Sequence, residues 1–493
     1  MVEIIEKINS AVNNFVWGIP VLSLLIFTGV LMTILTKGFQ FSHIGHWLKG
    51  TIGSVFKKDV SGKNKDKGSI SQFQALCTAL AATVGVGNIA GVATAIVVGG
   101  PGAIFWMWIA AIFGTMTNFS ENVLGIYYRR KNVKGEWAGG AMYYLSQGVS
   151  KKKGFKHIGK ILAILFSCFA ILASFGIGNM TQINTIALNM KSAFSVPTIV
   201  SGIGLMILAG LVIMGGIKRI ASVTEKIVPT MVVLYLVGAI VIIFANFSRI
   251  GAAFESIFAF AFGLRAVGGA AVGVAVRAAI TMGFKRGVFS NEAGLGSSVM
   301  VHSASNVKEP VRQGMWGIFE VVADTLIVCT LTALVILTSG LIDLQTGTML
   351  TDAEGSVLVS NAFENVFGIA GSAFIAIAIL LFAFSTVLGW SYYGTKAWEF
   401  LFGTKSTMIY KTVFVLFILV GATMSLGLVW DISDTFNGLM ALPNLIGVII
   451  LSPVVLKITS NYVKRKFKKE NIEPMLNSDP EIQKSEAEAL NND

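Results

Sequence analysis

The sequence predicts an all-α integral membrane protein with eleven transmembrane helices: one extra N-terminal helix, then a 5+5 inverted repeat with two broken helices. Three observations predict this fold: the apolar composition, the separation of basic from acidic loops, and two glycine-interrupted spans at corresponding positions. The 493 residues are 54% hydrophobic and 13% charged, so too few charges remain to cover a water-soluble globule. This composition argues against soluble enzymes and nucleic-acid-binding modules.

Eleven runs are long enough to cross a bilayer, at about 20 apolar residues per crossing. They lie near residues 15–36, 70–98, 102–128, 161–190, 196–216, 222–246, 251–284, 311–339, 368–400, 408–430 and 433–457. We expect an N-terminal helix and loop at 1–68, a first five-helix repeat at 69–247, a second at 248–460 and a tail at 461–493. The tail is charged and lacks a periodic apolar face, which predicts disorder.

Basic residues are concentrated in alternate loops. Threading eleven spans places most of the 38 Lys and Arg on one side, in loops 37–69, 129–160, 217–226, 285–312 and 396–411 and in the chain after 456. The opposite side carries the acidic residues Asp343, Asp352, Glu354, Glu364, Asp431 and Asp434. Because basic loops stay in the cytoplasm, we expect a multi-pass protein of the cell membrane with its N-terminus outside and its C-terminus cytoplasmic.

The second span is interrupted near its middle by Thr83, Gly85, Gly87, Asn88 and Gly91. Irregular backbone at membrane depth persists only where it is buried in protein or lines a cavity. The alternative interpretation is that Gly87 and Gly91 form a small-residue helix contact. Since Asn88 is costly in lipid without a partner, we expect the helix to unwind here around a binding site.

The seventh span repeats this pattern with Gly263, Gly268, Gly269 and Gly273. Both interrupted helices come first in their set of five once the first helix is set aside. Glycine-interrupted segments at corresponding positions of two halves are typical of secondary transporters with a site at the bilayer midplane. Freed N–H groups suit an anion and freed carbonyls suit a cation, so a zwitterion with a cation would satisfy both.

Polar residues on neighbouring helices are candidates to complete the site. Ser385 and Thr386 lie side by side in the ninth span, and Asn179, Gln182 and Asn184 lie in the fourth. Hydroxyl and carbonyl oxygens are hard ligands that suit sodium, while an amide can bind a carboxylate or an ammonium group. The alternative for the two hydroxyls is a hydrogen bond to a carbonyl one turn earlier, as is common in membrane helices.

Two stretches resemble one known family. Residues 99–114, GGPGAIFWMWIAAIFG, are similar to the signature of the alanine or glycine:cation symporters, also called sodium:alanine symporters. Residues 287–298, GVFSNEAGLGSS, resemble a second hallmark of that family. The likeness extends over residues 10–465 and implies a leucine-transporter-like fold. It also implies uptake of a small neutral amino acid such as alanine or glycine, driven by a sodium ion or a proton, with no enzymatic activity.

The resemblance further implies which residues form the site. The N–H groups of Val86 and Gly87 would hold the substrate carboxylate, and the carbonyls of Gly268 and Gly269 would face its ammonium group. The substrate-binding set is Thr83, Gly85, Val86, Gly87, Asn88, Gln182, Gly268, Gly269, Phe384 and Trp390, in which Trp390 and Phe384 limit the length of the side chain. The sodium ligands would come from Ala81, Val84, Phe382, Ser385 and Thr386.

Several ionisable residues lie near membrane depth and are functional candidates by default. Glu320 and Asp324, spaced i, i+4, share one helix face and are interpreted as partners of an arginine or as part of a proton path. Glu292, in the second hallmark, is expected to tie the cytoplasmic end of the seventh span to a neighbour or to cap a helix.

The sequence therefore predicts cation-coupled symport by alternating access, without a cofactor besides the coupling ion. A passive channel, a membrane enzyme and a same-fold carrier of another solute are the alternatives, although no HExxH or GxSxG motif is present. Sodium against proton, the stoichiometry, the oligomeric state and the preference among glycine, alanine and serine stay open.

Overall fold

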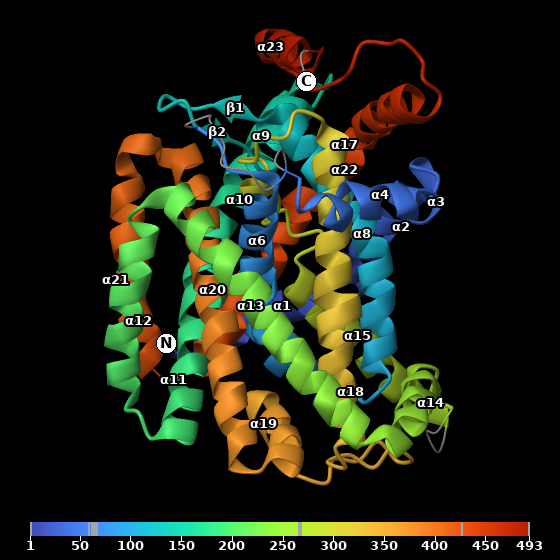
Figure 1. Ribbon diagram of the computed structural model, residues 1–493, viewed down its shortest axis with the longest axis vertical. Helices are drawn as coiled ribbons and strands as arrows, with labels where there is room; N and C mark the ends of the chain where they lie inside the picture. The colour runs from blue at the N-terminus through green and yellow to red at the C-terminus, as the bar shows by residue number, and fades with distance from the viewer. Residues whose placement is uncertain (1, 58–59, 61–67, 265–268, 425–426, 492–493) are drawn as a thin grey trace.

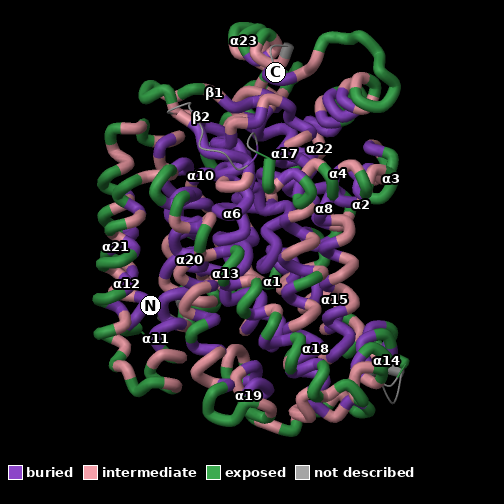
Figure 2. The backbone as a smooth tube through the Cα atoms, viewed as in Figure 1, coloured by how far each residue is buried: buried purple, intermediate pink, exposed green. Residues whose placement is uncertain are grey.

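The computed structural model describes residues 2–57, 60, 68–264, 269–424 and 427–491. Its helices stand side by side along the long axis, and a two-stranded hairpin and the C-terminal helix cap one end (Figure 1). Buried residues fill the middle of the bundle, whereas α12 and α21 carry many exposed residues along their length (Figure 2). The exposed side chains on these two helices include Leu208, Leu211 and Leu416, as expected for a surface that faces lipid.

Eight helical stretches among the described residues are long and apolar enough to cross a membrane. They are Glu3–Leu35, Ala103–Tyr128, Lys156–Phe194, Gly216–Ala245, Pro310–Thr338, Ile369–Phe402, Thr404–Thr423 and Trp430–Phe467. The bent pair Gln72–Thr83 and Gly87–Gly99 makes a ninth if it is one span, and Thr198–Ile213 is apolar but shorter. The chain is thus a multi-pass membrane protein, while the count of eleven spans stays a prediction.

The first half of the chain contains the N-terminal helices and the first helix set. The N-terminal part comprises α1 (Val2–Val16), α2 (Ile19–Leu35), α3 (Phe39–Ser42), α4 (Ile44–Gly50) and η1 (Ile52–Ser54). The set that follows comprises α6 (Gln72–Thr83), η2 (Gly87–Gly91), α7 (Val92–Gly99), α8 (Ala103–Tyr128), α10 (Lys156–Phe175), η5 (Gly176–Met180), α11 (Thr181–Phe194), α12 (Thr198–Ile213) and α13 (Gly216–Ala245). Between α8 and α10 lie the antiparallel strands β1 (Arg130–Lys131) and β2 (Trp137–Ala138), then α9 (Ala141–Tyr143), η3 (Tyr144–Gly148) and η4 (Val149–Lys151).

The second half contains the other helix set and the tail. It comprises η6 (Phe247–Arg249), α14 (Ile250–Ala261), α15 (Gly269–Asn291), α16 (Val299–His302), α17 (Pro310–Val321), η7 (Val322–Cys329), α18 (Thr330–Thr338), α19 (Gly355–Phe367), α20 (Ile369–Phe402), η8 (Thr404–Ser406), α21 (Thr407–Thr423), α22 (Gly427–Phe467) and α23 (Pro480–Asn491). The helices η2, η3, η5 and η7 are π-helical turns, which are frequent at functional sites.

The first break lies where the sequence predicts it. Helix α6 begins with a capping box in which Ser71 and Gln74 satisfy each other's backbone N–H groups at 3.1 Å. It ends at Thr83, the helix resumes at Gly87, and the two segments are bent by 50°. The small residues and the polar cluster between them therefore coincide with a real interruption of the helix.

The predicted second break lies partly outside the described residues: α14 ends at Ala261 and Gly263 has a φ of 70°, but residues 265–268 are not described. Gly268 lies outside the described residues, and Gly269 begins α15, which then continues through Gly273 to Asn291 without interruption. The chain unwinds only after Asn291, where Glu292, Gly294 and Gly296 all have positive φ angles of 56°, 92° and 72°. This segment belongs to the loop predicted at 285–312, yet residues 288–305 are buried in the protein. The break at Gly263, Gly268 and Gly269 therefore stays a prediction, whereas Gly273 lies inside a continuous helix and the buried break after Asn291 was not predicted.

The C-terminal tail, expected to be disordered, is folded onto the rest of the chain. Helix α22 continues to Phe467, and α23 follows after an extended segment. Glu486 of α23 forms an ion pair of 2.7 Å with Arg129, and Asn477 donates hydrogen bonds to the carbonyls of Ile126 and Arg129 at 3.4 and 3.2 Å. Arg129 is fully buried, so a carboxylate partner offsets part of the cost of burying its charge.

Candidate functional site

Two hydroxyl groups and two carbonyl groups meet where α6 ends against α20. The Thr386 hydroxyl donates to the carbonyls of Ala81 and Phe382 at 2.9 and 3.0 Å. The Ser385 hydroxyl contacts the same two carbonyl oxygens at 3.4 and 2.8 Å. The bonds to Phe382 run to a carbonyl one turn earlier in α20, as expected if the hydroxyls only satisfy their own helix. The bonds to Ala81 instead connect α20 to α6. The structure thus brings together four of the five predicted sodium-ligand residues.

Val84, the fifth predicted ligand residue, directly follows Thr83, the last residue of α6, and opens the break. Its ψ of 88° is not helical, so the chain turns away from the helix axis at its carbonyl. Gly85 follows, and a Cβ there would lie 2.4 Å from the Thr386 hydroxyl oxygen. Only glycine allows the unwound chain to approach α20 this closely.

The N–H groups at the break are bonded by two side chains. Asn88 accepts a hydrogen bond from the N–H of Gly85 at 2.9 Å, and Gln182 accepts one from the N–H of Val86 at 3.3 Å. The Gln182 amide also donates to the carbonyl of Ile177 at 2.9 Å, which fixes its orientation. Gln182 therefore lies at the break, as the resemblance implies.

Asn88 finds the partner that its burial demands. Its amide donates to Oδ1 of Asp324 at 2.7 Å and to the Asp324 carbonyl at 3.3 Å. Asp324 also accepts a bond of 2.8 Å from Thr325, whose hydroxyl accepts one of 3.0 Å from Asn291 at the second break. This sequence of contacts, which we call the Asp324 bridge, joins both breaks through η7. We interpreted Asp324 as a partner of an arginine or as part of a proton path; its described partners are uncharged, and the proton path stays a prediction.

Glu320 lies one turn before Asp324 and was interpreted in the same two ways, as a partner of an arginine or as part of a proton path. It contacts His302 of α16 at 3.0 Å and accepts a bond of 3.2 Å from Asn118 of α8. Both members of the His302–Glu320 pair are fully buried. Among the described residues its partners are therefore a histidine and an amide rather than an arginine.

A small cavity lies at the first break. It has about 10 Å³ of space for a water-sized probe, which is roughly the volume that one water needs. Its lining residues are Ala82, Thr83, Gly85, Gly87, Ile177, Gln182, Phe289, Glu292, Thr386 and Trp390. Trp390 lines it as predicted, whereas Phe384 is half-buried elsewhere on α20 and does not.

Four lining residues were missed as site residues in the sequence: Ala82, Ile177, Phe289 and Glu292. Phe289 and Glu292 belong to the second hallmark, and Glu292 was expected at the cytoplasmic end of its helix. Instead Glu292 starts the second break beside the cavity, where Ser297 donates to its carboxylate at 2.5 Å. Residues 291–298, NEAGLGSS, combine polar residues with two glycines, and this pattern could have indicated a second break. Their low hydropathy led us to assign them to a loop.

A larger cavity, which we call the vestibule, leads to the break from the face opposite α23. It has a volume of about 710 Å³ and is lined by residues that include Val86, Gly87, Phe289, Trp430 and Asp434. Phe289 and Gly87 line both cavities, so the two cavities adjoin at these residues. The Phe289 ring stacks on Trp430 with 6.3 Å between ring centroids, and Lys285 forms an ion pair of 2.5 Å with Asp434 nearby.

Comparison with known proteins places this arrangement in one family. The profile of the sodium:alanine symporter family matches residues 2–477. The chain belongs to the sodium:alanine symporter family. Like its family, it is a cation-coupled amino-acid transporter rather than an enzyme. It is similar to the sodium/alanine symporter AgcS of Methanococcus maripaludis, with 45% identity over 92% of this chain and 96% of the relative.

Other symporters and one solved structure extend this comparison. The probable sodium/glutamine symporter GlnT of Bacillus subtilis is 37% identical over 94% of this chain and 92% of its own length. The crystal structure of MhsT in complex with L-phenylalanine matches with a TM-score of 0.53 and 15% identity, over 80% of this chain and 99% of MhsT. The family and this likeness give the symporter a leucine-transporter-like fold.

Proposed function

We propose that the protein imports a small neutral amino acid, alanine or glycine, together with a sodium ion by alternating access. The observation that carries this proposal is the group of four oxygens at Ala81, Phe382, Ser385 and Thr386, next to the bonded N–H groups of the broken helix. A same-fold carrier of another solute, with a proton as the coupling ion, is the second candidate.

Sodium fits the oxygen group by its chemistry. Two carbonyls and two hydroxyls are uncharged hard ligands, which suit a monovalent hard cation. On binding, the hydroxyl groups of Ser385 and Thr386 would turn their hydrogens away from the Ala81 and Phe382 carbonyls. The ion would then lie between the four oxygens. The Val84 carbonyl would complete the set. Because Ala81 is on α6 and Phe382 on α20, a bound ion would tie the broken helix to α20.

The substrate carboxylate would take the place of the Gln182 oxygen at the Val86 N–H and reach the Gly87 N–H. Helix N-termini with freed N–H groups favour an anion. Glu292, which lines the same cavity, offers a carboxylate to the substrate ammonium in place of the Gly268 and Gly269 carbonyls expected before. Thr83 and Trp390 form the walls beside it.

Small side chains fit this site best. The cavity holds about one water, so even alanine requires Phe289 or Trp390 to move. AgcS, the more similar of the two relatives, is a sodium/alanine symporter and thus supports alanine as the substrate. GlnT is a probable sodium/glutamine symporter, which would favour a substrate with a longer side chain. Alanine and glycine require the smaller displacement.

The position of the two cavities supports the proposed alternating access. The vestibule opens on the face opposite α23, which is the outer face under the orientation expected from the basic loops. Substrate would enter there, pass between Phe289 and Trp430, and leave toward the α23 face after the breaks rearrange. One sodium ion that crosses about 100 mV and a tenfold gradient supports on the order of 500-fold accumulation of a neutral solute.

Uptake of radiolabelled alanine into proteoliposomes tests the proposal. We expect saturable uptake that requires an inward sodium gradient, is stimulated by an inside-negative potential and is inhibited by unlabelled glycine. Uptake driven by a pH gradient alone would support the proton-coupled candidate, and uptake that does not saturate would support a channel. Inhibition by glutamine but not by glycine would overturn the assigned substrate.

A further inference from the structure

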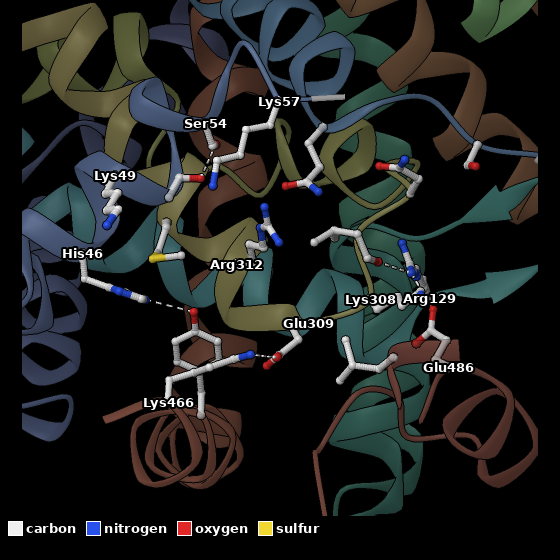
Figure 3. Close-up of a pocket in the computed structure, with 18 of the residues that line it drawn as sticks. His46, Lys49, Ser54, Lys57, Arg129, Lys308, Glu309, Arg312, Lys466 and Glu486 are labelled. Carbon is white, nitrogen blue, oxygen red and sulfur yellow. Dashed lines mark hydrogen bonds and ion pairs between the residues drawn. The ribbon is translucent and has the colours of Figure 1, made fainter. Parts of the chain in front are cut away.

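A second large cavity lies on the face that carries α23 (Figure 3), and none of its lining residues lines the vestibule or the cavity at the first break. It has a volume of about 760 Å³. Helices α4, α6, α17, α22 and α23 contribute to it, as do η1 and residues that follow η1 and α8. Its charged lining residues are Lys49, Lys57, Arg129, Lys308, Arg312 and Lys466, with the carboxylates Glu309 and Glu486.

The cavity carries an excess of positive charge. Glu309 pairs with Arg465 at 2.7 Å and with Lys466 at 3.4 Å, and Glu486 pairs with Arg129 at 2.7 Å. Six Lys and Arg side chains and two carboxylates thus line the cavity, which gives the described lining a formal charge of +4 (six minus two). Burial lowers the pKa of His46 in the lining, and the nearby charges of Lys466 and Arg312 lower it further. The cavity is therefore suited to an anion.

An apolar face borders this cavity. Phe41, Ile44, Leu48, Ile52 and Phe56 follow one another at spacings of three or four residues, and their side chains are between 39% and 98% exposed. The same segment turns His46, Lys49 and Lys57 toward the cavity. One apolar face beside one basic face is the pattern of a segment that lies in the membrane interface.

We propose that the cavity binds the headgroup of an anionic phospholipid, whose acyl chains run along the apolar face of residues 41–56. Basic pockets between helices on the cytoplasmic side are typical sites for lipid phosphates. A general excess of basic loops explains cations around this end of the bundle, but not their convergence on one concave surface next to exposed apolar side chains. The site is independent of the proposed transport function.

Lipid binding to the purified full-length chain tests this inference. The wild type, reconstituted in nanodiscs of phosphatidylcholine with or without phosphatidylglycerol, should gain thermal stability from the anionic lipid and retain it in native mass spectrometry. The triple variant Lys49→Gln, Lys57→Gln, Lys466→Gln should bind that lipid about 100-fold more weakly, because each basic side chain contributes to attraction at an anionic surface.

A matched control comes from the same face of the molecule. Lys151, Lys152 and Lys153 are exposed and do not line the cavity, so Lys151→Gln, Lys152→Gln, Lys153→Gln should keep the lipid effect. Equal loss in both triple variants would overturn the assigned site. An equal gain in stability from glycerol 3-phosphate or inorganic phosphate alone would overturn the lipid in favour of a soluble phosphate compound.

A single variant keeps the test decisive if the lysine variant does not fold. Phe56 is 98% exposed, so Phe56→Ser leaves the packing of the protein intact. It should weaken retention of phosphatidylglycerol but leave any effect of glycerol 3-phosphate unchanged. Unchanged lipid retention would overturn the part of the inference that concerns the acyl chains.

Discussion

The side-chain amide of Asn88 donates a hydrogen bond of 2.7 Å to the carboxylate of Asp324, while its oxygen accepts one of 2.9 Å from the N–H of Gly85. One side chain therefore satisfies the first break and ties it to η7 at the same time. Both residues are fully buried, so neither has water as an alternative partner. Asn88 is the residue whose loss should disturb the broken helix most directly.

We expect Asn88→Ala to destabilise the protein and to abolish transport. The change leaves a buried carboxylate and a buried N–H without their partner, at a cost of about 1–3 kcal/mol. Thermal unfolding in detergent and alanine uptake would measure both effects. The control Asn365→Ala removes an exposed amide with a single bond of 3.2 Å to the carbonyl of Ser339 and should change neither. Full activity of Asn88→Ala would contradict its role at the break.

Gly85→Ala should stop sodium-dependent uptake. The added Cβ would lie 2.4 Å from the Thr386 hydroxyl, a distance that real contacts do not reach, so the break must move away from α20. Gly91→Ala, six residues further along the same broken helix, meets no atom within 4 Å and should transport normally. Sodium-dependent uptake measured side by side decides the matter, and equal activity of the two variants would refute the close contact.

The double variant Ser385→Ala, Thr386→Ala should raise the sodium concentration for half-maximal uptake at least about tenfold, since each lost charge-assisted oxygen contact is worth about 1.5–3 kcal/mol. The matched control is Ser391→Ala, Thr395→Ala. These hydroxyls also bond to carbonyls of α20, at 2.7 and 2.6 Å, but they do not bond to the Ala81 carbonyl at the end of α6. If both double variants respond to sodium alike, the oxygen group is not the sodium site.

Gln182→Ala should weaken the binding of alanine more than the binding of sodium. Its amide bonds the Val86 N–H at 3.3 Å and the Ile177 carbonyl at 2.9 Å, but contacts none of the four proposed sodium-ligand oxygens. The half-saturating alanine concentration should rise about tenfold or more, as expected when a buried polar group loses its partner. A larger change in sodium dependence than in alanine dependence would count against this assignment.

The docking of α23 should depend on pH. Burial raises the pKa of Glu486, although the charge of Arg129 opposes this. A carboxyl group whose pKa is higher when docked favours docking below its ordinary value of about 4.3, and this contribution is lost as the pH rises through the raised value. Hydrogen exchange of α23 amides, corrected for intrinsic rates, should therefore increase with pH above that range. The variant Glu486→Gln should show no such increase.

The sequence predicts most of the helices and the first break because both depend on local features. Apolar runs of sufficient length define the helices, and glycines next to Asn88 inside such a run indicate an interrupted helix. Ser385, Thr386 and Gln182 also lie at this break. They could be predicted because a pair of hydroxyls, or a group of amides such as the one around Gln182, requires hydrogen-bond partners inside an apolar helix. These residues carry their signal in their own segment.

The second break depends on contacts that no local pattern contains. Residues 291–298 are polar enough to resemble a loop, and they are buried only because other helices satisfy them. Asn444 of α22 donates to the Gly294 carbonyl at 2.9 Å, and Ser297 bonds Glu292. The folded tail is a similar case, since Arg129 and its carboxylate partner Glu486 lie 357 positions apart.

The Asp324 bridge also bears on how tightly ion movement and substrate movement would be coupled. With Asn88 at one end and Asn291 at the other, neither interrupted helix can shift without straining or severing a bond to its counterpart. Motion in one half is thereby mechanically linked to motion in the other. In the proposed transport cycle, this linkage would disfavour conformations in which only one break has rearranged. Such conformations would let an ion cross without substrate and dissipate the gradient.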